Sequence, residues 1–245
     1  MDKLLTVVIP SYNVEKFLNQ TLDSFVCDEA VMKKFEVIVV DDGSKDSTAK
    51  IGKEYADKYP DTFRVISKEN GGHGSTINCG IRNAVGKYFK VVDGDDWVNT
   101  ADFVKLVEDL EKTESEYVFT NYNEYYDDVN RQKSVDFPQF KDGTEYDFAD
   151  VANKVYIPMH ALVIKTSVLK DNNIVIDEKC FYVDVEYVMF PVPFVNKVTF
   201  FDLHVYMYRL ALSTQSVSIL GFQKHINDHL RVCLLYTSPS PRDTR

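Results

Sequence analysis

The residues most able to do chemistry are the three carboxylates of one short segment, Asp93-Gly94-Asp95-Asp96. Carboxylate oxygens are hard ligands that suit Mg²⁺ or Mn²⁺, so this segment is a candidate metal site. Like charges this close repel one another, so a cation or hydrogen-bond donors should neutralise them. A solvated acidic turn is the alternative, because Asp-x-Asp is common by chance. The apolar run 88–92 before the segment and Trp97 after it favour the metal site.

Two further polar segments follow apolar runs in the same way. Asp41-Asp42-Gly43-Ser44 comes after the run 35–40, and one of its carboxylates could accept a hydrogen bond from a base or a ribose. Capping of the next helix is the alternative explanation. Asn70-Gly71-Gly72-His73-Gly74 leads into a helical pattern, and such a glycine-rich loop can hold an anion. Its spacing matches neither a Walker loop nor a dinucleotide fingerprint, and His73 either touches a phosphate or only packs in the loop.

The elements that position these segments alternate regularly over the first hundred residues. Short apolar runs predict buried strands at 5–9, 35–40, 63–66 and 88–92, and helical spacing predicts helices at 14–26, 47–59 and 75–85. This order is typical of a parallel sheet covered by helices on both faces. Ligands of such sheets bind beyond the carboxyl ends of the strands, so segments 11–13, 41–44 and 93–96 should meet in one crevice.

The second half of the chain is less regular. Helical spacing predicts helices at 101–112 and 184–190, and apolar patterns predict strands within 117–135 and at 162–164, 198–201 and 205–208, with a loop at 136–147. No internal repeat or clean linker interrupts the sequence. We therefore expect one domain over residues 1–232, with a nucleotide-binding half at 1–100 and an acceptor-side half at 101–232.

Composition narrows the class of protein. With 44% hydrophobic residues among 245, the chain can bury a core, and a net charge of −10 argues against nucleic-acid binding. The four cysteines have no metal-like spacing and predict free thiols in a reducing compartment. The first residues lack the pattern of a signal peptide, and no apolar run is long enough to span a bilayer. We expect a cytoplasmic protein, with peripheral association at the inner face of the membrane left open.

The last residues pose a separate question. Residues 233–243 match the translation, in one frame, of a transposase-based sequencing adapter. A natural Ser/Pro-rich tail is the alternative. We expect residues 233–245 to be non-native, and the natural sequence to continue differently after Val232.

Taken together, segments 7–13, 39–44, 70–72 and 92–97 resemble the family 2 glycosyltransferases, which are inverting enzymes with the GT-A fold. The resemblance is strong over residues 4–100 and looser over 155–218. It implies an α/β GT-A fold, with a Rossmann-like, mostly parallel mixed sheet flanked by helices. It also implies a UDP-sugar as donor substrate, Mn²⁺ or Mg²⁺ as cofactor, and a glycan, lipid-linked or cell-surface acceptor.

The resemblance assigns roles in donor binding. Pro10 and Tyr12 would border the nucleobase pocket, and Asp41 or Asp42 would bind the uracil or ribose. Asp93 would reach the ribose, and Asp95 would coordinate the cation that bridges the diphosphate, with Asp93 as a second predicted metal ligand. Further predicted donor contacts are Asn13, Asn70, Gly72 and Asn78.

An inverting transfer also needs a general base for the acceptor hydroxyl. In the family this is the Asp of a Glu-Asp pair at the start of a later helix, and Val183-Asp184 stands in that place, with Val183 replacing the Glu. The resemblance implies Asp184 as the base, with Glu186 as its competitor. The alternative is an acidic residue favoured by the helix dipole, which would lower its pKa unless burial compensates.

Other charged and polar residues have weaker predicted roles. Arg209 could pair with the diphosphate, and Gln215 and Ser216 could lie over the donor; Arg82 could contact diphosphate or belong to the surface. His225 and His229 are spaced i, i+4, which suits a metal site but also a surface helix. A nucleotidyltransferase is disfavoured, because Pro10-Ser11-Tyr12-Asn13 stands where its glycine-rich motif would be. A non-catalytic nucleotide- or carbohydrate-binding module would bind UDP without transfer.

Overall fold

The computed structural model describes residues 3–210 and 223–237. Strands and helices alternate in the first half: β1 (Leu5–Ser11), α1 (Leu18–Asp23), α2 (Glu29–Met32), β2 (Phe35–Asp41), α3 (Thr48–Lys58), β3 (Phe63–Ser67), α4 (His73–Asn83) and β4 (Tyr88–Val91). The remaining elements are β5 (Trp97–Val98), α5 (Thr100–Asp109), η1 (Leu110–Lys112), β6 (Tyr117–Tyr126), β7 (Arg131–Val135), β8 (Thr144–Asp147), α6 (Phe148–Val151), η2 (Met159–Ala161), β9 (Leu162–Lys165), α7 (Thr166–Asp171), α8 (Asp184–Met189), η3 (Val192–Phe194), β10 (Lys197–Leu210) and α10 (Ile226–Thr237).

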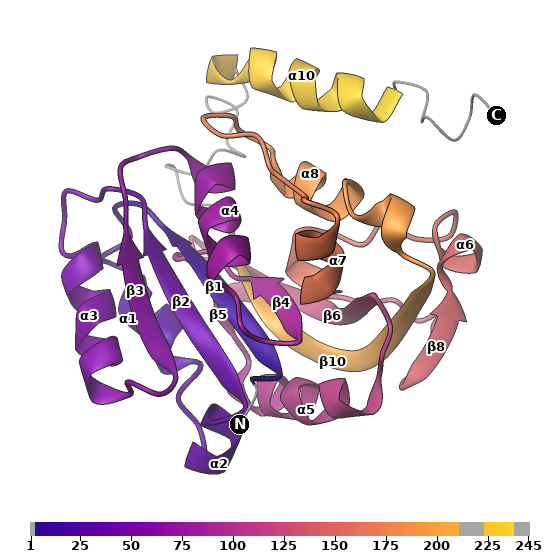
Figure 1. Cartoon of the computed structure of the whole chain (residues 1–245), viewed down its shortest axis with the longest axis horizontal. Coiled ribbons are helices and arrows are strands. Elements are labelled where there is room, and N and C mark those ends of the chain that lie inside the picture. Colours follow the sequence, from indigo (N-terminus) through magenta and orange to yellow (C-terminus); the bar gives the residue numbers. More distant parts are fainter. Residues whose placement is uncertain (1–2, 211–222, 238–245) are drawn as a thin grey trace.

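The described strands form one sheet in the order β3-β2-β1-β4-β9-β6-β10-β5, with β7 paired to β6 and β8 to β10. The first four strands run parallel, as does β6 beside β10. Antiparallel β9 lies between β4 and β6 and joins the two halves. The long β10 curls around the second half (Figure 1). The sheet is therefore mixed, and the predicted α/β class is confirmed.

Successive side chains of the central strands point to opposite faces of the sheet, so each strand contributes to two hydrophobic cores. Val8 and Ile38 point into the core that α4, α7 and α8 cover. Val7 and Val37 belong to the opposite core, which α1, α3 and α5 cover. Both faces are buried, which is why the strands of the first half are continuously apolar rather than alternating.

Several predicted boundaries differ from the structure. The helix expected over 14–26 is only α1, because residues 14–17 form a separate turn in which the Phe17 amide donates to the Val14 carbonyl at 2.9 Å. The loop expected over 136–147 ends in β8, which finds a partner in β10. The two strands expected at 198–201 and 205–208 are one strand, with a register shift between Phe201 and His204. Within the described residues, no helix is long and apolar enough to cross a membrane.

Candidate active site

The three polar segments do meet at one edge of the sheet, because β2, β1 and β4 are parallel neighbours. Two adjoining cavities open there, and Pro10, His73 and Phe181 line both. We call the first, of about 370 Å³, the acidic cavity; it is also lined by Val14, Asp93, Gly94, Asp95, Asp96, Met159, His160, Tyr182, Val183, Asp184 and Tyr208. The second, of about 430 Å³, is the Tyr12 cavity; it is also lined by Ser11, Tyr12, Asp42, Asn70, Gly72, Thr76, Lys179 and Cys180.

The acidic turn 93–96 presses closely against the end of β1. The Gly94 amide donates to the Pro10 carbonyl at 3.1 Å, and a Cβ on Gly94 would lie 2.9 Å from that oxygen. Only glycine fits such an approach without displacing the backbone. The glycine is therefore needed to place the flanking carboxylates at the cavity wall.

The three carboxylates of the turn differ in environment. Asp96 is buried, and its two oxygens accept hydrogen bonds from the Tyr206 hydroxyl at 2.6 Å and the Arg209 amide at 2.7 Å, which ties the turn to β10. Burial, followed by the charge of Asp95, raises the pKa of Asp96 well above its usual value. Burial and the charge of Asp93 raise the pKa of Asp95 to about 6. Burial and mutual repulsion thus disfavour the ionised forms of Asp95 and Asp96.

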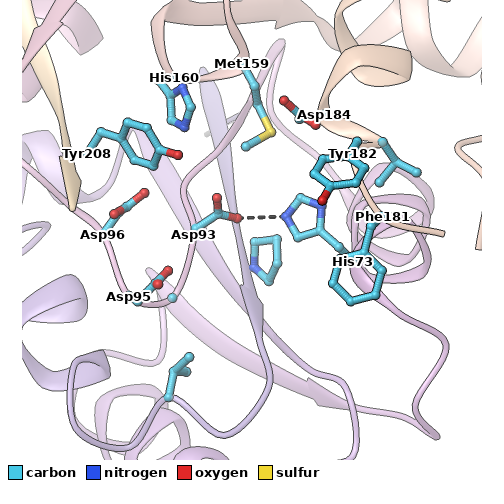
Figure 2. A pocket seen from close by; sticks show the side chains of 14 residues that line it. His73, Asp93, Asp95, Asp96, Met159, His160, Phe181, Tyr182, Asp184 and Tyr208 are labelled. Atoms are coloured by element: carbon cyan, nitrogen blue, oxygen red, sulfur yellow. Dashed lines mark hydrogen bonds and ion pairs between the residues drawn. The ribbon is translucent and has the colours of Figure 1, made fainter. Parts of the chain in front are cut away.

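Asp93 has a direct partner in His73, the first residue of α4. The His73 Nε2 atom lies 2.8 Å from Asp93 Oδ1 (Figure 2). Burial opposes ionisation of both groups, but their mutual attraction outweighs it. The pKa of His73 is raised and that of Asp93 is lowered. This ion pair stands where the two cavities join.

Asp184 lies across the acidic cavity from Asp95 and Asp96 (Figure 2). It is the first residue of α8, where the helix dipole would favour its ionised form. Burial is nevertheless the largest influence and, with the charge of Asp93, raises the pKa of Asp184 despite the nearby His73. A carboxylate with a raised pKa is a better proton acceptor, so burial supplies the compensation that the sequence could not show.

Glu186, the alternative base, is placed differently. Its side chain is buried and its Oε2 atom accepts a hydrogen bond from the Asp177 amide at 2.8 Å. It does not line either cavity. Of the two candidates, Asp184 is the carboxylate open to a substrate.

Asp42 lines the Tyr12 cavity, yet its oxygens are directed at the glycine-rich loop. They accept hydrogen bonds from Lys68 Nζ at 2.7 Å, the Gly71 amide at 2.9 Å and the Gly72 amide at 2.8 Å. Gly72 adopts a φ of 84°, and the next residue begins α4. The visible role of Asp42 is therefore to hold the loop that borders the cavity.

Several other predicted donor contacts do not line either cavity. Asp41 Oδ1 accepts from the Ser44 amide at 3.0 Å. Asn13 has a φ of 55°, and its Oδ1 atom accepts a hydrogen bond from the Lys45 amide at 2.8 Å. The Asn78 amide group binds the backbone of Ile176 in both directions, at 2.8 and 2.9 Å. These side chains are occupied by backbone groups outside the two cavities, and their roles as donor contacts remain predictions.

The structure also places most of the residues with weaker predicted roles. Arg209 is buried beneath the acidic turn, where its Nε atom donates to the Asp95 carbonyl at 2.8 Å and its Nη2 atom to Gln20 at 2.6 Å. Arg82 is exposed and lines neither cavity. Gln215 and Ser216 lie outside the described residues. The rings of His225 and His229 pack on Phe181 and Tyr182, and His225 Nδ1 lies 3.7 Å from Asp228 Oδ2.

The structure adds residues that the sequence did not single out. His160 comes from η2 and stacks on Tyr208, with ring centroids 4.0 Å apart. Burial lowers the pKa of His160 to about 4. Lys179 and Phe181 come from the segment before α8, and the Lys179 amide donates to the Gly71 carbonyl at 2.7 Å. No local pattern marked these residues, because they reach the site only through the sheet order.

Solved structures confirm the fold class. The chain superposes on Staphylococcus aureus TarS 1–349 in complex with UDP-GlcNAc with a TM-score of 0.73, at 19% identity, covering 98% of this chain and 68% of that one. It superposes on the mannosyltransferase PcManGT from Pyrobaculum calidifontis, in complex with GDP-Man and Mn²⁺, with a TM-score of 0.67, at 17% identity, covering 99% and 67%. Together with the curled mixed sheet, these likenesses show that the chain has the GT-A fold of these structures.

The family is shown by sequence. The profile described as "Glycosyl transferase family 2" matches residues 6–172, so the chain belongs to this family. It is 38% identical over 118 residues to the uncharacterized glycosyltransferase EpsJ of Bacillus subtilis, covering 48% of this chain and 33% of EpsJ. It is 33% identical over 111 residues to the minor teichoic acid biosynthesis protein GgaB of the same species, covering 45% and 12%. The matched stretch thus spans a third or less of these relatives.

Proposed function

We propose that this glycosyltransferase moves a sugar, with inversion, from a UDP-sugar to a hydroxyl of a glycan, lipid-linked or cell-surface acceptor. The observation that carries the proposal is that Asp184 and the acidic turn open into one cavity from different sides. Donor diphosphate and acceptor hydroxyl can then approach the same sugar carbon from opposite directions. The complexes of TarS with UDP-GlcNAc and of PcManGT with GDP-Man support a nucleotide-sugar donor.

The Tyr12 cavity is the proposed place of the nucleoside. Tyr12 exposes 48% of its surface there and offers a ring face for a base. Asn70 and the Gly72 backbone form the wall that Asp42 holds in place. The diphosphate would then lie near His73, where the two cavities join, and the sugar in the acidic cavity.

The acidic turn suits a divalent cation. It offers hard oxygen ligands, and burial, followed by repulsion from Asp93, raises the pKa of Asp95 to about 6 despite the nearby Arg209 and His73. We propose Asp93 and Asp95 as ligands from the turn, for Mn²⁺ or Mg²⁺. Such a cation, when bound, stabilises the charge of the departing diphosphate.

In the proposed reaction, Asp184 accepts the proton of the acceptor hydroxyl. The hydroxyl oxygen forms a bond to the anomeric carbon of the sugar while the bond from that carbon to the diphosphate oxygen breaks. The electron pair of the broken bond leaves with UDP. Because attack and departure occur on opposite faces, the anomeric configuration inverts.

The test separates donor binding from chemistry. Calorimetry should show UDP binding that depends on Mn²⁺ and is lost in EDTA. A panel of UDP- and GDP-sugars, followed by nucleotide release, then identifies the donor. Asp184→Asn should lower turnover by about 10²–10⁴-fold with UDP affinity unchanged. Glu186→Gln is the matched control and should turn over far better than Asp184→Asn. Full turnover in Asp184→Asn would refute the assignment of the base, and no UDP affinity with Mn²⁺ present would refute the donor.

A further inference from the structure

His160 lines the acidic cavity, but it has no role in the proposed reaction. Within residues 3–210 and 223–237, neither ring nitrogen of His160 has a hydrogen-bond partner in the protein. Its ring is held from two sides, by stacking on Tyr208 at 4.0 Å and by an edge contact with Tyr206 at 4.9 Å. The imidazole is thus fixed in orientation at the cavity wall (Figure 2).

His160 faces two carboxylates of the acidic turn. One nitrogen of His160 and one oxygen each of Asp93 and Asp96 all lie within 4.8 Å of one another. Two atoms that bind the same ion at about 2.1 Å lie at most about 4.2 Å apart. A small rotation of these side chains would therefore bring the three atoms close enough to bind one ion. The contacts that Asp96 makes with Tyr206 and Arg209 use one lone pair on each oxygen, and a second remains on each.

We propose that His160 is a nitrogen ligand of the divalent cation, completing a three-residue set with Asp93 and Asp96. This inference rests on the proposed function for the identity of the cation site and extends it beyond the acidic turn. The three ligands come from two parts of the sheet: the turn after β4 and η2 before β9. Asp95, also proposed above as a ligand from the turn, is not among the three groups that lie within 4.8 Å of one another, so it would be a fourth ligand.

The ligand type has a consequence for metal choice. An all-oxygen site suits Mg²⁺ and Mn²⁺ alike, whereas imidazole nitrogen is favoured by transition metals. His160 should therefore make the site prefer Mn²⁺ to Mg²⁺. A residue that only packs against Tyr208 would affect both ions equally.

The backbone oxygens of this segment are held independently of the imidazole. Lys90 Nζ donates to the His160 carbonyl at 2.9 Å and to the Leu162 carbonyl at 3.2 Å. Replacing the side chain at position 160 should leave these bonds in place. His160→Phe keeps a ring against Tyr208 and removes both nitrogens, and His160→Gln is a second, smaller variant.

The experiment measures Mn²⁺ and Mg²⁺ binding by calorimetry, with and without UDP, on the full chain. We expect Mn²⁺ affinity to fall at least about tenfold in His160→Phe and His160→Gln, and the preference for Mn²⁺ over Mg²⁺ to shrink. His204→Ala, a histidine paired with Asp136 away from both cavities, is the control and should bind Mn²⁺ as the wild type does.

Electron spin-echo spectroscopy of the Mn²⁺ complexes of the wild type and of His160→Phe tests the nitrogen ligand directly. A ¹⁴N coupling that disappears in His160→Phe supports the proposal. An all-oxygen spectrum in the wild type, or unchanged Mn²⁺ affinity in folded His160 variants, overturns it. If UDP binding still requires Mn²⁺ in that case, the proposed function stands and only the ligand assignment fails.

Discussion

The replacement of Asp42 by Asn tests whether this carboxylate holds the glycine-rich loop. Asp42 is 2% exposed and accepts three short hydrogen bonds, one of them from the Lys68 ammonium. Hydrogen bonds to a charged group contribute about 1.5–3 kcal/mol each. Asparagine keeps one oxygen but turns an NH₂ group toward a backbone donor, so at least one buried donor loses its acceptor.

We therefore expect Asp42→Asn to lower the free energy of unfolding by about 3 kcal/mol. For a chain of this size that corresponds to a Tm lower by about 6–12 °C, measured by circular dichroism. Asp57→Asn is the matched control, because Asp57 is 65% exposed in its pair with Lys53, and its Tm should not change.

The same variant separates two explanations of a binding defect. If Asp42 acts through the loop, UDP affinity and Tm fall together. If Asp42 instead contacts the nucleotide directly and does little for the loop, affinity falls while Tm stays within about 2 °C of the wild type. The second outcome would refute the reasoning from the hydrogen bonds.

Two further predictions concern the acidic turn. Arg209→Lys should lower the free energy of unfolding by about 2–4 kcal/mol, because an ammonium cannot reproduce the guanidinium contacts to the Asp95 carbonyl and Gln20. Thermal denaturation measures this change, and an unchanged Tm would show that those contacts do not contribute to stability. Mn²⁺ affinity should weaken as the pH falls through about 6, where the pKa of Asp95 lies, because protonation removes negative charge from the cavity. Calorimetry between neutral and acidic pH measures this, and Asp95→Asn should flatten the dependence; an equally steep loss in that variant would assign it to another group.

The architecture of the first half could be predicted from the sequence because its signals are local. Each buried strand of the first half is a short apolar run, and each is followed by its polar segment, so strand order alone brings the segments together. The roles of single side chains within those segments could not be predicted in the same way. Asn78 and Ile176 are 98 positions apart, yet the amide of one is occupied by the backbone of the other.

The sequence could indicate a position for the proposed base, but it could not indicate the pKa of that carboxyl. A resemblance located Asp184 at the start of a helix, where elementary electrostatics predicts a lowered pKa. The structure raises the pKa instead, because burial in the acidic cavity exceeds the effect of a helix of six residues. Burial depends on the segments packed around a side chain, and those come from distant parts of the chain. His160 was missed for the same reason.

Trp97 is the single tryptophan of the sequence, and it directly follows the acidic turn. The Arg209 guanidinium lies 4.7 Å from the centre of its ring, and Tyr125 meets it edge-on at 5.2 Å. Arg209 also holds the Asp95 carbonyl, so any ion or nucleotide that shifts the turn changes the electric field at the indole. We therefore expect the intrinsic fluorescence of Trp97 to change when an ion or nucleotide binds, so that binding can be followed in real time without a label.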